Sequence, residues 1–225
     1  SVPLGMGVLG QETTGPGGIC FALRTIPVMT RLAETMAAHS NGWLINFTNP
    51  AGMVTEAVRQ VLGDRAVGIC DSPSGLCRRV ARAVGRERGD LAFDYFGLNH
   101  LGWLKGVRSR DGELLAGLLA DDAALGGFEE GRLFGRDWLR ALGMIPNEYL
   151  YFFYYASDTV AAIRAQPEAR GAFLLEQQRA FYAGNGQPPA AALAAWRATR
   201  HDRERTYMAE ARSAAGDAGE HDIEE

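Results

Sequence analysis

The sequence predicts an α/β fold with a parallel sheet in its first part and a mostly helical second part. Two short apolar runs of strand type, residues 43–47 and 66–70, are each followed by a polar turn and by a segment with helical spacing. Strand, turn and helix in this repeated order are typical of parallel α/β sheets. Beyond residue 113 most segments have helical spacing, which indicates that the second part is built mainly from helices.

Local signals predict the elements of the first part. A glycine-rich segment at residues 5–18 favours a loop that approaches a ligand closely, because glycine adopts backbone conformations that other residues avoid. A helix is expected next, over residues 19–40, with a kink or a new first turn at Pro27. Two further helices are expected at residues 51–62 and 76–84, each after a short strand that we expect to be buried.

The second part is expected to begin with two strands within residues 93–107, joined through residues 97–100. Helices are then expected at residues 149–155, 158–183 and 190–214. These elements divide the chain into residues 1–90, residues 91–216 and an acidic tail, residues 217–225, which is expected to fray.

Composition excludes several classes of function. The 225 residues carry 23 Lys and Arg against 27 Asp and Glu, so the formal charge of −4 lacks the basic excess that nucleic acid or an anionic membrane attracts. The sequence has no apolar run of the roughly 18 to 20 residues that a membrane span needs. With no signal peptide at its start, the protein is expected to be cytoplasmic. Three cysteines, an odd number, favour reduced thiols over a disulfide framework.

Candidate chemistry gathers at the ends of the predicted strands. In a parallel sheet, ligands bind beyond the carboxyl ends of the strands, where Cys70 and Asp71 are expected. His100 lies at another predicted strand end, so its imidazole and the Cys70 thiolate together could hold a divalent transition metal with substrate oxygens and water. A Cys–His nucleophilic pair is the alternative, and it would need a third group to orient the histidine.

Two other polar groups stand out in less regular surroundings. Glu12 lies in the glycine-rich segment beside Gln11 and Thr13, which are neighbours of the kind that hydrogen-bond sugar hydroxyls. Tyr149 follows a Pro–Asn helix start, a place where a side chain can point into a cleft. An ordinary packing role is the alternative for Tyr149, because an aromatic ring buries well.

Five stretches of the sequence share their order and spacing with one known family. They are residues 10–18 (GQETTGPGG), 22–27 (ALRTIP), 46–52 (NFTNPAG), 68–71 (GICD) and 97–103 (GLNHLGW). Together they resemble the family 4 glycoside hydrolases, and most closely the 6-phospho-β-glucosidases of that family. The resemblance covers residues 1–155 well and the helical remainder loosely.

The resemblance implies a fold and an unusual chemistry. Residues 1–90 would be the latter part of a doubly wound, Rossmann-like NAD-binding domain, joined to a mostly helical catalytic domain at residues 91–216, as in lactate and malate dehydrogenases. The implied activity is NAD-dependent, Mn²⁺-assisted hydrolysis of 6-phospho-β-glucosides to glucose 6-phosphate, an exception to the usual two-carboxylate mechanism. The implied partners are the phosphorylated glucoside and further copies of the chain, in a homodimer or homotetramer.

Residue roles follow from the same resemblance, motif by motif. Cys70 and His100 match the metal ligands, and Tyr149 matches the base that removes the proton from C2 of the sugar after oxidation at C3. Asn49 and Glu12 match positions that contact the sugar.

Two departures from the family leave alternatives open. Asp71 matches a position where aspartate is linked to protonation of the leaving group in α-linked substrates, so a 6-phospho-α-glucosidase is the first alternative. The family's initial nucleotide-binding βαβ unit has no counterpart before Ser1, and Gly-x-Gly-Gly at residues 15–18 does not follow a strand. We therefore expect a fragment that is inactive alone, with no residue assigned to NAD. The second alternative is a truncated, non-catalytic binding or assembly module.

Overall fold

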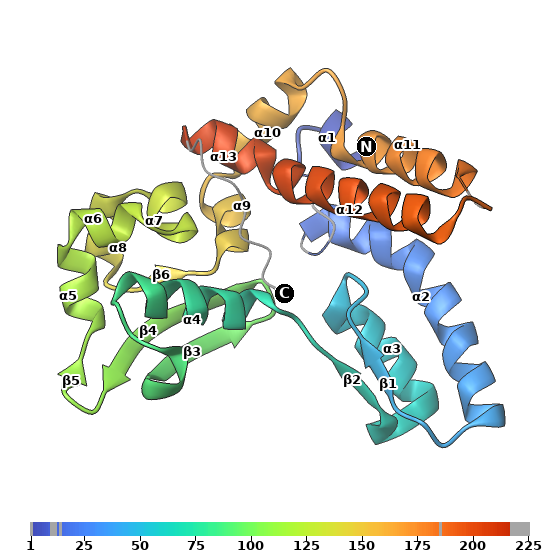
Figure 1. The fold of residues 1–225 in the computed structure, drawn as a ribbon, viewed down its shortest axis with the longest axis horizontal. Helices are drawn as coiled ribbons and strands as arrows, with labels where there is room; N and C mark the ends of the chain where they lie inside the picture. The colour runs from blue at the N-terminus through green and yellow to red at the C-terminus, as the bar shows by residue number, and fades with distance from the viewer. Residues whose placement is uncertain (1, 10–12, 14, 185, 217–225) are drawn as a thin grey trace. The chain divides into compact units, whose positions relative to one another are not determined.

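The computed structural model describes residues 2–9, 13, 15–184 and 186–216, and it divides the chain into two compact units. Unit 1 comprises Ser1–Ala156, and unit 2 comprises Ser157–Glu225. Both are drawn in Figure 1, and each is described by itself. The domain boundary predicted near residue 90 stays a prediction, and the predicted tail at residues 217–225 lies outside the described residues.

The first elements of unit 1 form a small parallel α/β layer. In chain order they are α1 (Val2–Gly5), α2 (Gly15–His39), β1 (Leu44–Asn46), α3 (Ala51–Leu62), η1 (Gly63–Arg65), β2 (Ala66–Gly68) and α4 (Ser72–Ala83). Strands β1 and β2 pair in parallel, with Leu44 opposite Ala66. The order of strands and helices confirms the predicted α/β class. Within the described residues the parallel sheet has two strands, β1 and β2.

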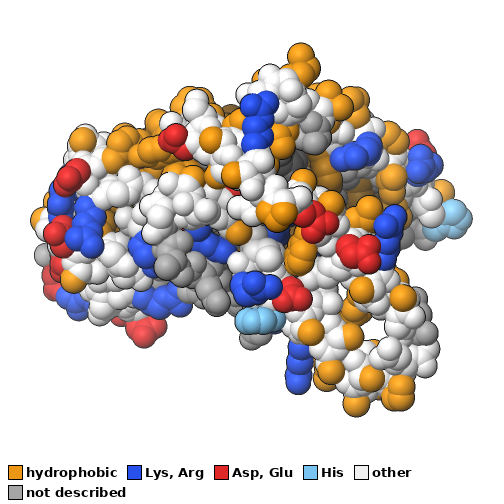
Figure 2. Space-filling view, turned by 90° about the horizontal axis from the view of Figure 1, so that it is seen from above, with side chains coloured by type: hydrophobic (Ala, Val, Ile, Leu, Met, Phe, Trp, Pro, Cys, Tyr) orange, Lys and Arg blue, Asp and Glu red, His pale blue; other side chains and the backbone are white. Residues whose placement is uncertain are grey.

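The parallel strands are buried on one face. Leu44 and Ala66 pack in a core with Ala33 of α2 and Val58 and Leu62 of α3. Alternate residues of each strand point to the opposite face, where Ile45 and Val67 are exposed. The expectation that both strands are buried is therefore wrong for this face. Figure 2 shows a different aspect of the surface, a face on which acidic and basic side chains are interspersed and hydrophobic side chains are also exposed.

Helix α2 begins earlier than predicted. Residues 15–18, expected to belong to a loop, form its first turn, because glycines and a proline are tolerated where backbone N–H groups have no helical partner. The helix then continues through Pro27 to His39. No helix in the described part of the chain is long and apolar enough to cross a membrane.

An antiparallel sheet forms the middle of unit 1. Its strands are β3 (Ala92–Leu98), β4 (Leu101–Ser109), β5 (Gly112–Glu113) and β6 (Ile145–Pro146), and the turn η2 (Arg88–Asp90) precedes β3. Strand β4 pairs with each of the other three. Strands β3 and β4 form the predicted hairpin, whose two-residue turn is Asn99–His100.

Short helices complete unit 1. They are α5 (Leu115–Ala120), α6 (Asp122–Gly126), α7 (Glu129–Phe134), α8 (Arg136–Leu142), η3 (Glu148–Leu150) and α9 (Tyr151–Tyr154). Leu104, Leu125, Leu139 and Ile145 are fully buried and belong to the apolar interior of this part. The predicted helix at residues 149–155 is thus a 3-10 turn followed by one turn of α-helix.

Unit 2 is helical, as predicted, but its two long helices are interrupted. The elements are α10 (Ala156–Ala165), which begins at the end of unit 1, α11 (Arg170–Ala183), α12 (Pro189–Thr206) and α13 (Ala209–Ala215). Pro167 separates α10 from α11, because proline disfavours helical backbone at the residue before it and lacks a donor. Met208, in the left-handed region at φ 48°, separates α12 from α13.

Candidate active site

The structure brings Cys70 and His100 into contact. Cys70 lies two residues beyond β2, at the carboxyl end of the parallel strand, and His100 lies in the turn of the β3–β4 hairpin. The Cys70 Sγ and His100 Nε2 atoms are 3.2 Å apart. His100 is buried and has a φ of 61°, which is uncommon for a residue other than glycine and concentrates at functional sites.

Burial determines the charge state of this pair. Desolvation raises the pKa of the Cys70 thiol, although hydrogen bonds from Ser72 oppose the shift. Desolvation also lowers the pKa of His100 to about 4, so the imidazole is neutral at pH 7. Its Nδ1 atom has no hydrogen-bond partner among the described residues. An imidazolium–thiolate nucleophile would need a basic, oriented histidine, so these observations favour the metal-binding interpretation.

The donor atoms fit a divalent transition metal. The Cys70 Sγ and His100 Nε2 atoms, 3.2 Å apart, are close enough for one metal ion to contact both. A thiolate and a neutral imidazole are ligands of soft to borderline character. Within the described ranges there is no cluster of three or more His, Cys, Asp or Glu that could hold a metal. The sequence-based prediction that substrate oxygens and water complete the coordination stays a prediction.

Tyr149 stacks on the imidazole of His100. The two ring centroids are 3.7 Å apart, and the ring planes differ by 3°. The Asn147 Oδ1 atom accepts a hydrogen bond from the Tyr149 backbone N–H, and the Asn147 N–H donates to the Gly102 carbonyl on β4. The turn that carries Tyr149 is thereby fixed to the hairpin that carries His100.

Asp71 and Asn49 lie at the ends of the two parallel strands. Asp71 is exposed at the N-terminus of α4, directly after Cys70. Its negative charge adds to the desolvation that raises the pKa of Cys70, and it partly opposes the desolvation that lowers the pKa of His100. Asn49 is half-buried in the turn after β1. Buried Asn46 holds this turn, because its Nδ2 donates to the carbonyls of Thr48 and Ala51 and to the Thr55 hydroxyl. Glu12, the other residue matched to the sugar, lies outside the described residues.

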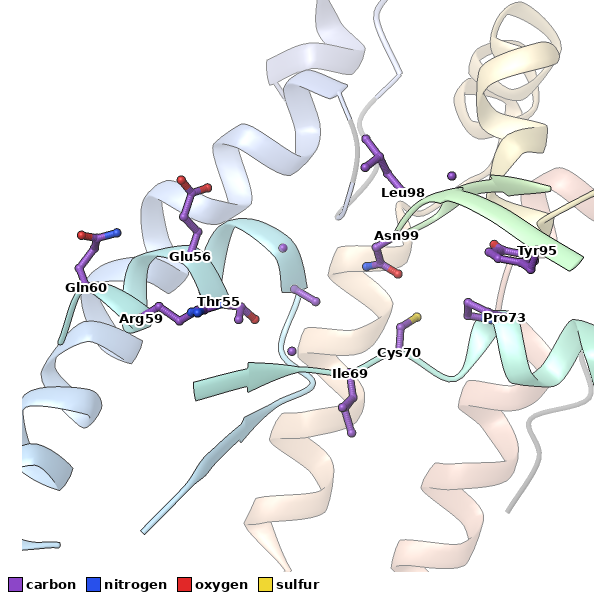
Figure 3. Close-up of a pocket in the computed structure, with 14 residues that line it drawn as sticks. Thr55, Glu56, Arg59, Gln60, Ile69, Cys70, Pro73, Tyr95, Leu98 and Asn99 are labelled. Carbon is purple, nitrogen blue, oxygen red and sulfur yellow. The ribbon is translucent and has the colours of Figure 1, made fainter. Parts of the chain in front are cut away.

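A cleft of about 700 Å³ opens beside Cys70 (Figure 3). Helix α3 contributes Thr55, Glu56 and Arg59 to one side, and β3 contributes Tyr95 to the other. In Figure 3 the Cys70 side chain points toward the hairpin turn. Cys70 therefore faces a space of the size that binds a small molecule.

Sequence reasoning missed two kinds of residue near this site. Tyr95 lines the cleft, and its buried hydroxyl has no hydrogen-bond partner in the part of the chain described. Arg79, Glu130 and Glu148 form a buried ionic cluster. One signal was available for Arg79: its spacing from Leu76 and Val80 puts a charge on the apolar face of a helix.

The fold and the site define an α/β protein with a Cys–His pair at the carboxyl end of a parallel strand. Residues 1–86 match the family 4 glycosyl hydrolase profile, and residues 95–218 match the profile of the C-terminal domain of that family. The chain belongs to family 4 of the glycosyl hydrolases.

Two curated relatives and two solved structures illustrate the similarity. The 6-phospho-alpha-glucosidase 1 of Lacticaseibacillus paracasei is 38% identical over 176 residues, which are 71% of this chain and 40% of that protein. The 6-phospho-beta-glucosidase of Escherichia coli is 37% identical over 169 residues, 71% of this chain and 38% of that protein. The chain thus spans well under half the length of these relatives.

Among solved structures, the Thermotoga maritima 6-phospho-beta glucosidase with NAD and glucose-6-phosphate has a TM-score of 0.72 at 25% identity, over 95% of this chain and 50% of that one. A 6-phospho-alpha-glucosidase from gut microorganisms, in complex with NAD and Mn²⁺, has a TM-score of 0.59 at 28% identity, over 71% of this chain and 40% of that one.

Proposed function

We propose that this chain carries the metal-binding and proton-abstracting end of a 6-phospho-β-glucosidase that uses NAD and Mn²⁺. The observation that carries the proposal is the stack of Tyr149 on His100, whose Nε2 is 3.2 Å from the Cys70 Sγ. This arrangement puts a phenol next to the two side chains that we propose as metal ligands. Family membership and the relatives' activities support the same substrate class, a glucoside phosphorylated at O6.

The proposed roles divide the chemistry among the residues of this chain. When bound, NAD would accept and return the hydride at C3 of the sugar, and the dication would favour negative charge on nearby oxygens. Cys70 and His100 would hold the metal. Tyr149, as phenolate, would accept the proton from C2, whose acidity is raised by the oxidised C3. The C2–H electrons form the C1–C2 double bond while the bond from C1 to the aglycone oxygen breaks, and that oxygen takes a proton from water or an acid. Water then adds across the double bond, with hydroxyl at C1 and a proton at C2, before C3 is reduced again.

Asp71 supports a second candidate, hydrolysis of the α anomer. A carboxylic acid beside the site can give its proton to the departing aglycone oxygen, and Asp71 is exposed next to Cys70. Relatives named for each anomer match the chain at similar identity, 38% for the α enzyme and 37% for the β enzyme. The two candidates share every other residue role.

The test uses the full-length product of the gene that encodes this chain, supplied with NAD and Mn²⁺. Hydrolysis of nitrophenyl 6-phospho-β-glucoside is compared with that of the α anomer, and deuterium uptake from D₂O at C2 of the product is measured. Tyr149→Phe should lower both turnover and deuterium uptake by at least about a hundredfold. Tyr182→Phe, an exposed tyrosine on α11, is the matched control and should keep both.

Each outcome decides between the proposals. Preference for the α anomer, lost in Asp71→Asn, would replace the β assignment. Wild-type deuterium uptake in Tyr149→Phe would refute the role of Tyr149. A protein that hydrolyses neither anomer would refute the proposed activity.

A further inference from the structure

The buried ionic cluster of Arg79, Glu130 and Glu148 is next to the candidate site, because Glu148 immediately precedes Tyr149 in the sequence. Arg79 of α4 donates from Nε to one carboxylate oxygen of Glu130 at 3.1 Å and from a terminal nitrogen to the other oxygen, a two-pronged pair. The same terminal nitrogen is 3.6 Å from Glu148 Oε2. The side chains of Arg79, Glu130 and Glu148 are at most 5% exposed.

This cluster joins the segments that carry the site residues. Helix α4, which holds Arg79, begins two residues after Cys70, and Glu148 immediately precedes Tyr149. Ser72, at the start of α4, is close to both Cys70 and Glu148, where it opposes the rise in the pKa of each. The segments that carry Cys70, His100 and Tyr149 therefore meet beside this cluster.

Local backbone makes room for the guanidinium. A Cβ atom at Gly75 would lie 3.0 Å from a terminal nitrogen of Arg79, closer than ordinary side-chain contacts. Arginine suits this place better than lysine, because its planar group binds one carboxylate with two donors and presents others to a second acceptor. A larger residue at position 75 would require the Arg79 guanidinium to shift by a few tenths of an ångström.

Stability alone explains this cluster poorly. A buried ion pair gains little free energy over well-packed apolar residues, because both charges lose their hydration. A buried group that is polar and fixed in direction can instead select one arrangement of the chain. We propose that Arg79, together with Glu130 and Glu148, is a positioning element that holds Tyr149 in its stack on His100. The measurement of kcat described below rests on the proposed function, whereas the measurement of the His100 ring signals does not.

The first measurement needs no activity. The chain contains four histidines, so the ring signals of ¹³C-labelled histidine are few, and His100→Gln assigns the one of interest. A tyrosine ring stacked at 3.7 Å displaces the His100 signals upfield, and Tyr149→Leu defines the complete loss of that displacement. Arg79→Met keeps the length of the side chain and removes its charge and donors. It should abolish about half of the displacement or more, whereas Arg79→Lys should abolish less.

A control and a second variant keep this measurement decisive. Arg82→Met changes an exposed arginine on the same helix and should leave the His100 signals in place. If Arg79→Met does not fold, Glu148→Gln, which keeps the shape of the side chain, takes its place. A folded Arg79→Met or Glu148→Gln whose His100 signals coincide with those of the wild type overturns the proposal.

The second measurement separates positioning from loss of folded protein. With substrate deuterated at C2, a displaced Tyr149 makes proton removal more rate-limiting, so kcat should fall about tenfold or more and the isotope effect on kcat should rise. A lower fraction of folded enzyme would reduce kcat and leave the isotope effect unchanged, and that result would overturn the proposal. If the wild type hydrolyses no phosphoglucoside, the proposed function fails, while the His100 signals still decide the inference.

Discussion

The pH dependence of folding stability offers a direct test of the buried site, because two of its groups act in opposite directions. Desolvation and the nearby Glu130 raise the pKa of Glu148 from its ordinary 4.5 to about 7. Desolvation lowers the pKa of His100 from 6.5 to about 4. In the folded chain Glu148 is 1% exposed and His100 is 2% exposed. Each group therefore reaches its ordinary pKa only when the chain unfolds.

The signs follow from which state binds more protons. Between about pH 4.5 and 7 the folded state holds the Glu148 proton and the unfolded state releases it, so this group's contribution to stability falls as the pH rises. Between about pH 4 and 6.5 the unfolded state protonates the histidine and the folded state does not, so the His100 contribution rises with pH. Either difference corresponds to about 3 kcal/mol at its full extent.

His100→Gln isolates the Glu148 contribution. Glu148→Gln removes that contribution, and because it also loosens the stack on His100 the expected rise in this variant is an upper limit. In the wild type the two contributions offset each other over most of the range, so the free energy of unfolding changes little from these groups. In Glu148→Gln it should rise by up to about 3 kcal/mol from pH 4 to 6.5, and in His100→Gln it should fall by a similar amount from pH 4.5 to 7. Urea unfolding followed by circular dichroism at half-unit pH steps measures both slopes. Parallel curves for the wild type and both variants would refute the buried charge states argued above.

Three further predictions concern neighbouring features. Because burial raises the pKa of the Cys70 thiol, binding of a divalent metal at pH 7 should release about one proton, measured by calorimetry in two buffers of different ionisation enthalpy, and none in Cys70→Ser. Gly102→Ala should cost about 1 to 3 kcal/mol, because a Cβ there overlaps a tyrosine ring of β3, whereas Gly117→Ala, with open space in α5, should stabilise slightly in the same thermal melts. Asn46→Asp should destabilise the chain by about 2 kcal/mol or more and loosen the turn carrying Asn49, seen as faster amide exchange there, because a carboxylate cannot donate the three bonds of this amide.

Short-range patterns were enough to predict the parallel α/β layer and the hairpin. The order of strand, turn and helix depends on periodicity and turn residues, which lie within a few positions of one another. The interruptions in unit 2 differ from each other in this respect. Pro167 marks the end of α10 in the sequence itself, whereas the left-handed Met208 has no local signal, because residues other than glycine rarely adopt that conformation.

Pairing of Cys70 with His100 was only partly predictable from topology. The carboxyl end of a parallel strand predicts where Cys70 lies, whereas His100 lies in the hairpin turn of a separate antiparallel sheet, which that rule does not place. The expected pairing depended on the chemistry of the two side chains and on the family resemblance. The parallel stack of Tyr149 on His100 is a different matter. It depends on the angle at which η3 leaves β6 and on the hydrogen bonds of Asn147, and neither has a periodic signature.

The contact between Arg79 and Glu130 could not be predicted from local sequence patterns, but a buried charge does predict that a partner exists. Arg79 and Glu130 are 51 positions apart, so no pattern within a helix or a turn relates them. A charge on the apolar face of a helix nevertheless needs a partner, because an unpaired buried guanidinium is too costly to keep. The same requirement holds for Glu148, a carboxylate in an otherwise aromatic and apolar stretch. Two buried ionisable side chains, each out of place in its own segment, therefore indicate that the segments meet, and here Arg79 and Glu148 lie 3.6 Å apart.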